Sequence, residues 1–196
     1  MSRPVYEELL GRLDHFSLSP AVVLDIDGQR AGLPEALRAR FARARIISTG
    51  QANKSAGVFA SMFERIVRRG SRIEYIDATL TRWPLDDQSV DLVVANDWAP
   101  GIEALDASLR EIHRVLLDGG LFLCSSPSAT AVRGQADIHD LGSALMRAGF
   151  VEPVLDIDRF ERDDREIIYV AAFSGGGRRR TSDGEVVVPF PKSSRR

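Results

Sequence analysis

The chain has 196 residues, of which 44% are hydrophobic and 28% are charged, and its formal net charge is −2. This composition is typical of a globular domain and gives no global charge argument for nucleic-acid binding, and no apolar run is long enough to span a bilayer. The single cysteine, Cys124, excludes an internal disulfide and a multi-cysteine metal site and fits a reducing compartment, so we expect a cytoplasmic protein.

Local patterns predict alternating helices and strands along the chain. Apolar residues three and four positions apart indicate amphipathic helices, whereas short apolar runs bounded by turn residues indicate strands. In chain order we predict a helix at 4–16, a strand at 21–24, a helix from Leu33, a strand at 45–48, a helix around 58–67, strands at 72–76 and 89–95, a helix from Leu105 that stops at Gly119–Gly120, a strand at 121–124, a helix from Asp137 to Gly149, and strands at 154–157 and 167–173.

This alternation predicts one α/β domain over residues 1–173, with a doubly wound and mainly parallel sheet covered by helices on both faces. From Ser174 onward the composition changes to SGGGRRRTSDG and other polar, basic sequence. Such a segment buries too little apolar surface to offset the entropy of ordering. We therefore expect residues 174–196 to form a flexible basic tail that proteases clip near Arg178 to Arg180.

The stretch AVVLDIDGQRAG, at residues 21–32, combines a strand, a tight turn and the start of a helix. In parallel α/β folds, ligands bind outside the carboxyl ends of the strands. Polar residues also follow the later strands: Thr49 follows the second, Asp77 the third and Asn96 the fourth. These residues are therefore the candidates for a ligand site at one edge of the sheet.

Four blocks of the sequence resemble the class I S-adenosylmethionine-dependent methyltransferases. The subgroup that they resemble most is the malonyl-acyl-carrier-protein O-methyltransferases of biotin synthesis. The resemblance covers roughly residues 5–173, and its blocks are EELLGRLDHFSLSPAVVLDI, IEYIDATLTRWPLDDQSVDLVVAND, ALDASLREIHRVLLDGGLFLCS and DIHDLGSALMRAGFVEPVLDIDRF.

This resemblance implies a Rossmann-like sheet and S-adenosylmethionine as the cofactor. It also implies a small-molecule or acyl-carrier-protein-linked methyl acceptor, with no membrane and no nucleic acid involved. The cofactor-binding positions that it implies are Asp25 after the first strand, Asp27 and Gly28 in the following loop, Thr49 at the ribose position, Asp77 and Ala78 at the adenine, and Asn96 at the methionine end. No catalytic residue is assigned, because methyl transfer depends mainly on positioning and desolvation and needs no fixed general base.

Two features depart from the family pattern. Asp27, Gln29 and Ala31 stand where the family has glycines, which let the backbone approach the cofactor closely. Gly28 restores part of this turn if the loop shifts by one residue. Thr49 stands where the family has an acidic acceptor for both ribose hydroxyls, and a neutral hydroxyl is a weaker partner. We therefore expect weak binding of S-adenosylmethionine.

Two alternatives remain open. The first is a catalytically inactive methyltransferase relative that acts as a binding partner or regulator of another protein. The second is a haloacid dehalogenase-type phosphohydrolase, because VVLDIDG also resembles that family's first motif, with Asp25 as nucleophile and Asp27 as general acid/base. The second alternative lacks the later acidic pair at a strand end, since Asp86–Asp87 and Asp163–Asp164 do not follow apolar runs.

Overall fold

A computed structural model describes most of the chain. The described residues are 5–26, 32–49, 73–76, 78–79, 81–128, 134, 136–160 and 165–175. The predicted helix around 58–67, the predicted tail at 174–196 beyond Gly175, and the candidate site residues Asp27, Gly28 and Asp77 lie outside the described residues.

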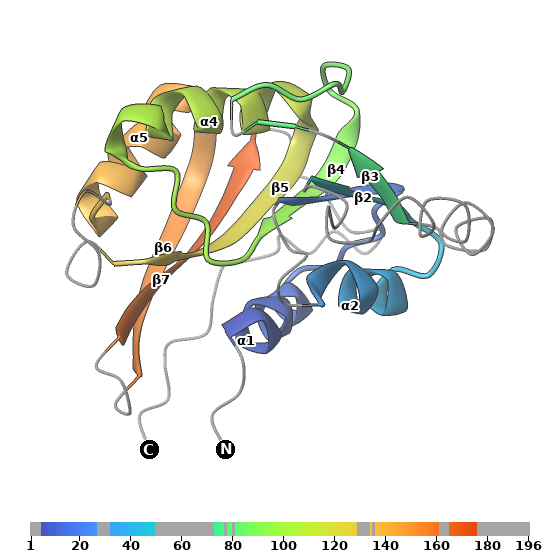
Figure 1. Cartoon of the computed structure of the whole chain (residues 1–196), viewed down its shortest axis with the longest axis horizontal. Coiled ribbons are helices and arrows are strands. Elements are labelled where there is room, and N and C mark those ends of the chain that lie inside the picture. Colours follow the sequence, from blue (N-terminus) through green and yellow to red (C-terminus); the bar gives the residue numbers. More distant parts are fainter. Residues whose placement is uncertain are drawn as a thin grey trace, which may run out of the picture.

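The described strands form one sheet in the order β3-β2-β1-β4-β5-β7-β6 (Figure 1). Neighbours from β3 to β5 are parallel, whereas β7 lies antiparallel between β5 and β6. This confirms the predicted mainly parallel α/β sheet. The strands are β1 (Val22–Ile26), β2 (Arg45–Thr49), β3 (Ile73–Ile76), β4 (Val90–Ala95), β5 (Leu116–Pro127), β6 (Phe150–Phe160) and β7 (Arg165–Ser174).

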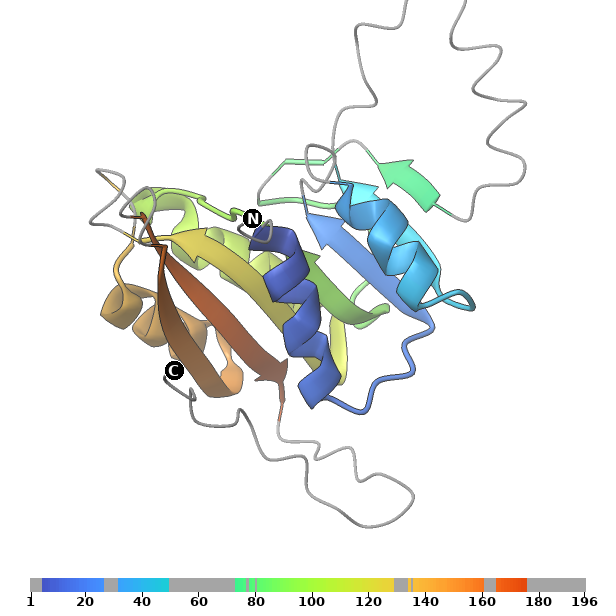
Figure 2. The same ribbon diagram turned by 90° about the horizontal axis from the view of Figure 1, so that it is seen from below.

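Helices cover both faces of the sheet, as predicted. Figures 1 and 2 show α1 and α2 on one face and α4 and α5 on the other. Alternate residues of each strand contribute to two separate apolar clusters, one beneath each helix layer. The helices are α1 (Val5–Arg12), followed by the 3-10 turn η1 (Leu13–His15), α2 (Leu33–Arg40), α4 (Ile102–Val115) and α5 (Ile138–Ala148).

Local signals place the ends of α5 where the sequence predicts them. The Asp137 side chain accepts a hydrogen bond from the backbone N–H of Asp140, and the Asp140 side chain accepts from the N–H of Asp137, which forms a capping box. Gly149 ends the helix in a left-handed conformation, with φ of 100°. The helix therefore begins and ends at residues suited to these positions.

The predicted end of α4 is wrong. The helix ends at Val115, and Gly119 and Gly120 lie inside β5. The register between β4 and β5 shifts at this point, and a Cβ atom on Gly120 would lie 2.9 Å from the carbonyl oxygen of Leu117. Gly120 is thus required by close backbone packing in an irregular strand and does not cap a helix.

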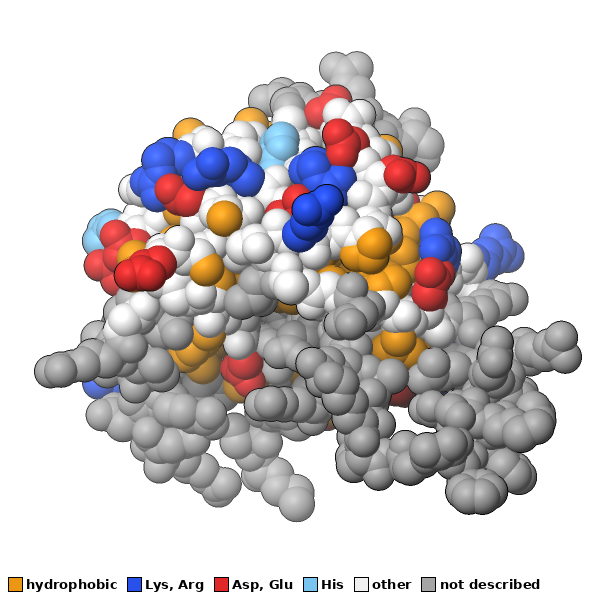
Figure 3. Space-filling model, turned by 45° about the horizontal axis from the view of Figure 1, so that its top comes forward, with side chains coloured by type: hydrophobic (Ala, Val, Ile, Leu, Met, Phe, Trp, Pro, Cys, Tyr) orange, Lys and Arg blue, Asp and Glu red, His pale blue; other side chains and the backbone are white. Residues whose placement is uncertain are grey.

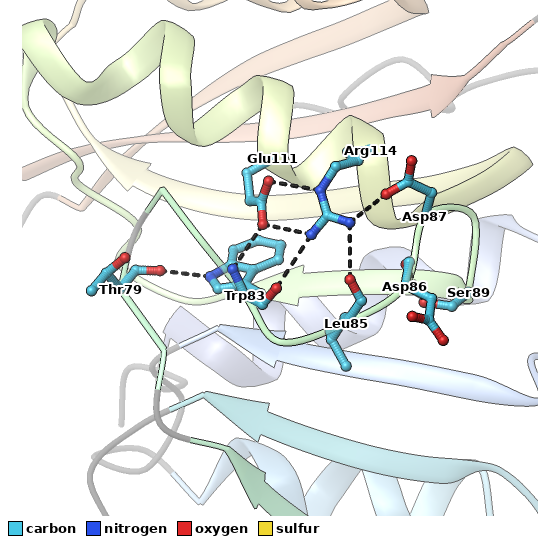
Figure 4. Close-up of polar contacts among 8 residues, drawn as sticks. All are labelled: Thr79, Trp83, Leu85, Asp86, Asp87, Ser89, Glu111 and Arg114. Atoms are coloured by element: carbon cyan, nitrogen blue, oxygen red, sulfur yellow. Dashed lines mark hydrogen bonds and ion pairs between the residues drawn. The ribbon is translucent and has the colours of Figure 1, made fainter.

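The segment between β3 and β4 is fixed to α4 by a hydrogen-bonded network around Arg114 (Figure 4). Glu111 accepts hydrogen bonds from the backbone N–H of Trp83, at 2.7 Å, and from Arg114. Arg114 also donates to the carbonyl oxygens of Leu85 and Trp83 and to the carboxylate of Asp87. The buried Trp83 ring packs in the apolar cluster beneath α4.

This network should make stability depend on pH. The hydrogen bond from Arg114 holds the pKa of Glu111 below its ordinary value, and the Trp83 N–H acts in the same direction. A carboxyl whose pKa is lower in the folded state stabilises the fold above its unfolded-state pKa of about 4.3, and this contribution is lost as the pH falls toward the folded-state pKa. Glu111→Gln should therefore flatten the loss of stability below about pH 5, as measured by urea unfolding. If Glu111→Gln loses stability at low pH as steeply as the wild type, Glu111 is not the group responsible.

The surface over α4 and α5 has no single charge sign. Figure 3 shows basic and acidic side chains interspersed on this face. One ion pair between α4 and α5 joins Asp106 and Arg147. The described part of this face therefore carries no basic patch of one sign. Of the helices that the structure describes, none has the length and apolar character needed to cross a bilayer.

Candidate functional site

The carboxyl ends of four parallel strands meet at one edge of the sheet. Ile26 at the end of β1 lies opposite Thr49 of β2 and Ala95 of β4, and Thr49 lies opposite Ile76 of β3. The last residues of these strands therefore lie side by side. This register brings together the described candidates Asp25, Thr49 and Asn96, and Ala78 follows β3 at the same edge.

Asp25 lies within β1, whereas the sequence placed it after the strand. Its side chain is completely buried, and its Oδ2 atom accepts a hydrogen bond of 2.6 Å from the hydroxyl of Ser48 on β2. A buried carboxylate needs such donors to offset its desolvation. Asp25 thus ties β1 to β2 directly before the loop that contains Asp27, and its buried position does not suit an exposed phosphohydrolase nucleophile.

Removing the hydroxyl of Ser48 should destabilise the protein. We expect Ser48→Ala to lower the free energy of unfolding by about 1–3 kcal/mol, because it removes a donor from a buried carboxylate. Ser89→Ala is a matched control, since the Ser89 hydroxyl donates to the Asp86 carbonyl in an exposed turn; it should cost less than about 0.5 kcal/mol. If urea unfolding shows equal losses of stability in the two variants, the buried Asp25–Ser48 hydrogen bond contributes no more than the exposed one.

Thr49 and Ala78 lie at the edge that the sequence predicts for the nucleoside part of a cofactor. Thr49 is 5% exposed and Ala78 is half-buried against the cluster beneath α4 and α5. Thr49 offers a neutral hydroxyl at this level. Among the described residues, no carboxylate stands at the end of β2.

Asn96 is held in a defined orientation after β4. Its Oδ1 atom accepts a hydrogen bond of 3.2 Å from the hydroxyl of Ser125 on β5, and Ser125 in turn accepts from the backbone N–H of Asp97, at 2.9 Å. The backbone of Trp98 donates to the carbonyl oxygen of Ser125, and the Trp98 ring packs edge-on against Phe122. The site therefore has a rigid floor between β4 and β5.

A second polar cluster lies on the same side of the sheet, and sequence reasoning missed it. Arg12 at the end of α1 donates to Asp156, at 3.0 Å, and to Asp158, at 2.8 Å, both on β6. Its guanidinium lies 4.0 Å from the centre of the Tyr169 ring on β7. Arg12 is separated from the two aspartates by 144 and 146 residues in sequence, so no local pattern predicts these contacts. We call this the Arg12 cluster, consisting of Arg12, Asp156, Asp158 and Tyr169.

Two other possible chemistries find no support. Burial raises the pKa of the Cys124 thiol far above its ordinary value, so it remains protonated and unreactive. The described residues contain no group of three or more His, Cys, Asp or Glu side chains placed to hold a metal ion. What the edge can do is bind a ligand through hydroxyl, amide and backbone groups over an apolar floor.

Comparisons with known proteins agree with this geometry. A methyltransferase domain family model matches residues 34–124. Malonyl-[acyl-carrier protein] O-methyltransferases of Methylovorus sp. (strain MP688) and Laribacter hongkongensis are 34% and 31% identical, covering 82% and 81% of this chain. The chain spans about 60% of the length of each of these two relatives.

The fold is also found in a solved structure. Haemonchus contortus phosphoethanolamine N-methyltransferase 2, in complex with S-adenosyl-L-methionine, matches 87% of this chain, and the match covers 53% of that protein. The TM-score is 0.68 and the sequence identity is 14%. At this identity the match establishes a shared class I methyltransferase fold, and it carries no argument about the ligand.

Proposed function

Because the chain has the class I methyltransferase fold and is a sequence relative of the malonyl-acyl-carrier-protein O-methyltransferases, we propose that it binds S-adenosylmethionine and transfers its methyl group. The observation that supports this most is the register at the carboxyl edge, where β1, β2 and β4 end side by side. That edge is where open α/β sheets bind their ligands.

The described residues fit part of this cofactor. Asn96, held by Ser125, presents an oriented amide at the position that the family uses for the methionine end. Thr49 presents one hydroxyl at the ribose position, where the family has a carboxylate. Ile26 and Ala95, which lie opposite each other at the ends of β1 and β4, are buried apolar residues beneath this edge. The fit therefore predicts binding through weaker ribose contacts.

S-adenosylmethionine supplies an activated methyl group, so the protein's contribution is alignment and exclusion of water. The bonds from Ser125 fix the segment that follows β4, and the Asp25–Ser48 contact fixes the start of the cofactor loop. Both sets of hydrogen bonds are already formed in the protein without ligand. The acceptor that we propose is an acyl-carrier-protein-linked or related small acyl compound, as in the relatives' names.

Thr49 favours one alternative, in which the chain is an inactive relative that binds a partner protein. A buried neutral residue at the ribose position removes a charged hydrogen bond that typically contributes about 1.5–3 kcal/mol. The two functions differ in a direct assay. Incubation with methyl-labelled S-adenosylmethionine and malonyl-acyl-carrier protein should give a labelled methyl ester above the level of a heat-denatured control. No label, together with no cofactor binding, would support the inactive relative.

A further inference from the structure

A row of polar side chains crosses the sheet just beyond the end of β4. The pairing of Ala95 with Cys124 places the next residues, Asn96 and Ser125, at one level. Ser125 lies opposite Tyr169 on β7, and Tyr169 lies opposite Asp156 on β6. This row leads from the proposed cofactor position to the Arg12 cluster, so the Arg12 cluster borders the side of the site where a methyl acceptor would lie.

Helix α1 packs on this face of the sheet through the completely buried Leu9, and the Arg12 cluster joins its carboxyl end to β6. The Arg12 side chain is 9% exposed, whereas those of Asp156 and Asp158 are 45% and 44% exposed. The guanidinium thus reaches across the Tyr169 ring from α1 to the edge strand β6. Because the two carboxylates are half in water, these ion pairs are modest in strength and can open.

The Tyr169 hydroxyl is the unusual member of the cluster. Tyr169 is completely buried, and its hydroxyl has no hydrogen-bond partner among the described residues. A buried hydroxyl without a partner is costly, and such groups in native proteins often serve a ligand. Burial raises the pKa of this phenol, partly opposed by Arg12, so the hydroxyl stays protonated and can donate a hydrogen bond.

We propose that α1 is a latched cover and that the Tyr169 hydroxyl donates a hydrogen bond to the methyl acceptor when the latch opens. This rests on the methyltransferase function proposed above. The latch consists of the contacts from Arg12 to Asp156 and Asp158. Opening it uncovers a donor on β7 at the level of Asn96, with β5 between the two residues.

The charges around Tyr169 indicate the chemical class of its ligand. The Arg12 guanidinium over the Tyr169 ring is already shared between the carboxylates of Asp156 and Asp158. A carboxylate placed here would meet repulsion from these acidic groups. A neutral carbonyl oxygen, such as that of an acyl thioester, accepts the hydrogen bond without that cost.

The first experiment measures the binding of malonyl-pantetheine and acetyl-pantetheine by calorimetry without cofactor. Tyr169→Phe should weaken both about three- to tenfold, because it removes one hydrogen bond to a shared carbonyl. Its thermal midpoint should equal or exceed that of the wild type, since an unpartnered hydroxyl is lost. Tyr75→Phe, a partly buried phenol on β3, should leave both affinities unchanged. Unchanged affinity in Tyr169→Phe, a penalty confined to the malonyl compound, or no binding by the wild type would overturn the proposal.

The second experiment tests the latch. Arg12→Met should speed hydrogen exchange of the amides in the last turn of α1 and tighten malonyl-pantetheine binding, because the cost of opening that end is lowered. Arg147→Met, which breaks the exposed pair with Asp106 on the opposite face, should change neither. If Arg12→Met does not fold, Asp158→Asn weakens the latch from its exposed side and should act in the same direction. Equal or weaker thioester binding in a folded latch variant would show that α1 is only structural.

The experiments distinguish a failure of the proposed methyltransferase function from a failure of the proposed acyl subsite at Tyr169. If the protein does not bind S-adenosylmethionine but Tyr169→Phe still weakens thioester binding, the methyltransferase function is wrong and the acyl subsite stands. If cofactor binds and Tyr169→Phe binds both thioesters like the wild type, the methyltransferase function stands and the subsite is wrong.

Discussion

The triple variant Thr49→Asp, Asp27→Gly, Gln29→Gly should bind S-adenosylmethionine about 2–4 kcal/mol more tightly than the wild type, or roughly thirty- to several-hundredfold. The new carboxylate provides a charged acceptor for the ribose hydroxyls, and the glycines allow the loop to approach the cofactor. Because Thr49 is buried, Thr49→Asp should lower the thermal midpoint without ligand and raise it when ligand saturates the site.

Asp77→Ala in the triple variant should remove part of this gain, because the family uses that position for the adenine amino group. Thr79→Asp is the matched control, since it adds the same charge at an exposed residue beyond β3; it should not tighten binding. If the folded triple variant does not bind S-adenosylmethionine, the cofactor site differs from the family at further positions. The protein would then be better explained as an inactive relative.

Glu111→Ala should cause the second largest effect, a loss of about 2–4 kcal/mol in the free energy of unfolding at neutral pH. The change leaves the backbone N–H of the buried Trp83 without its acceptor, which costs about 1–3 kcal/mol, and it also removes the principal partner of Arg114. The Arg114 contact adds only modestly, because its side chain is 32% exposed.

Glu103→Ala is the control for Glu111→Ala. Glu103 lies exposed in the first turn of the same helix, so its removal costs only the few tenths of a kcal/mol expected from the helix dipole. Urea unfolding of the two variants should separate them clearly. A loss below about 1 kcal/mol in Glu111→Ala would mean that the network does not hold the segment around Trp83.

Much of the fold could be predicted because its signals are local. Alternating apolar patterns locate the described helices and strands, and capping residues such as Asp137 and Gly149 locate helix ends. Gly119–Gly120 misled the prediction because glycine suits both a helix end and a close approach within a strand. Only the surrounding backbone, the carbonyl of Leu117 in β5 and that of Asp91 in β4, decides between these two roles.

The candidate site was predicted in outline. The order of strands and the residues that follow them predicted Asp25, Thr49 and Asn96 as site residues, and the register places the ends of β1, β2 and β4 side by side. The supporting contacts were not foreseen. Ser48 does carry a signal, since it is a polar residue directly after the two isoleucines of β2, but Ser125 and the Arg12 cluster depend on contacts between distant segments.

Calorimetric titration of the wild-type protein with S-adenosylmethionine tests the central claim most directly. The buried neutral Thr49 and the non-glycine loop positions predict weak but measurable binding. The dissociation constant should lie in the high micromolar range or above, which corresponds to a binding free energy on the order of −5 kcal/mol. The oriented Asn96 and the methyltransferase sheet predict that it is not zero. Dissociation constants in the low micromolar range would contradict the weakened site, and no heat of binding at millimolar cofactor would contradict the methyltransferase function itself.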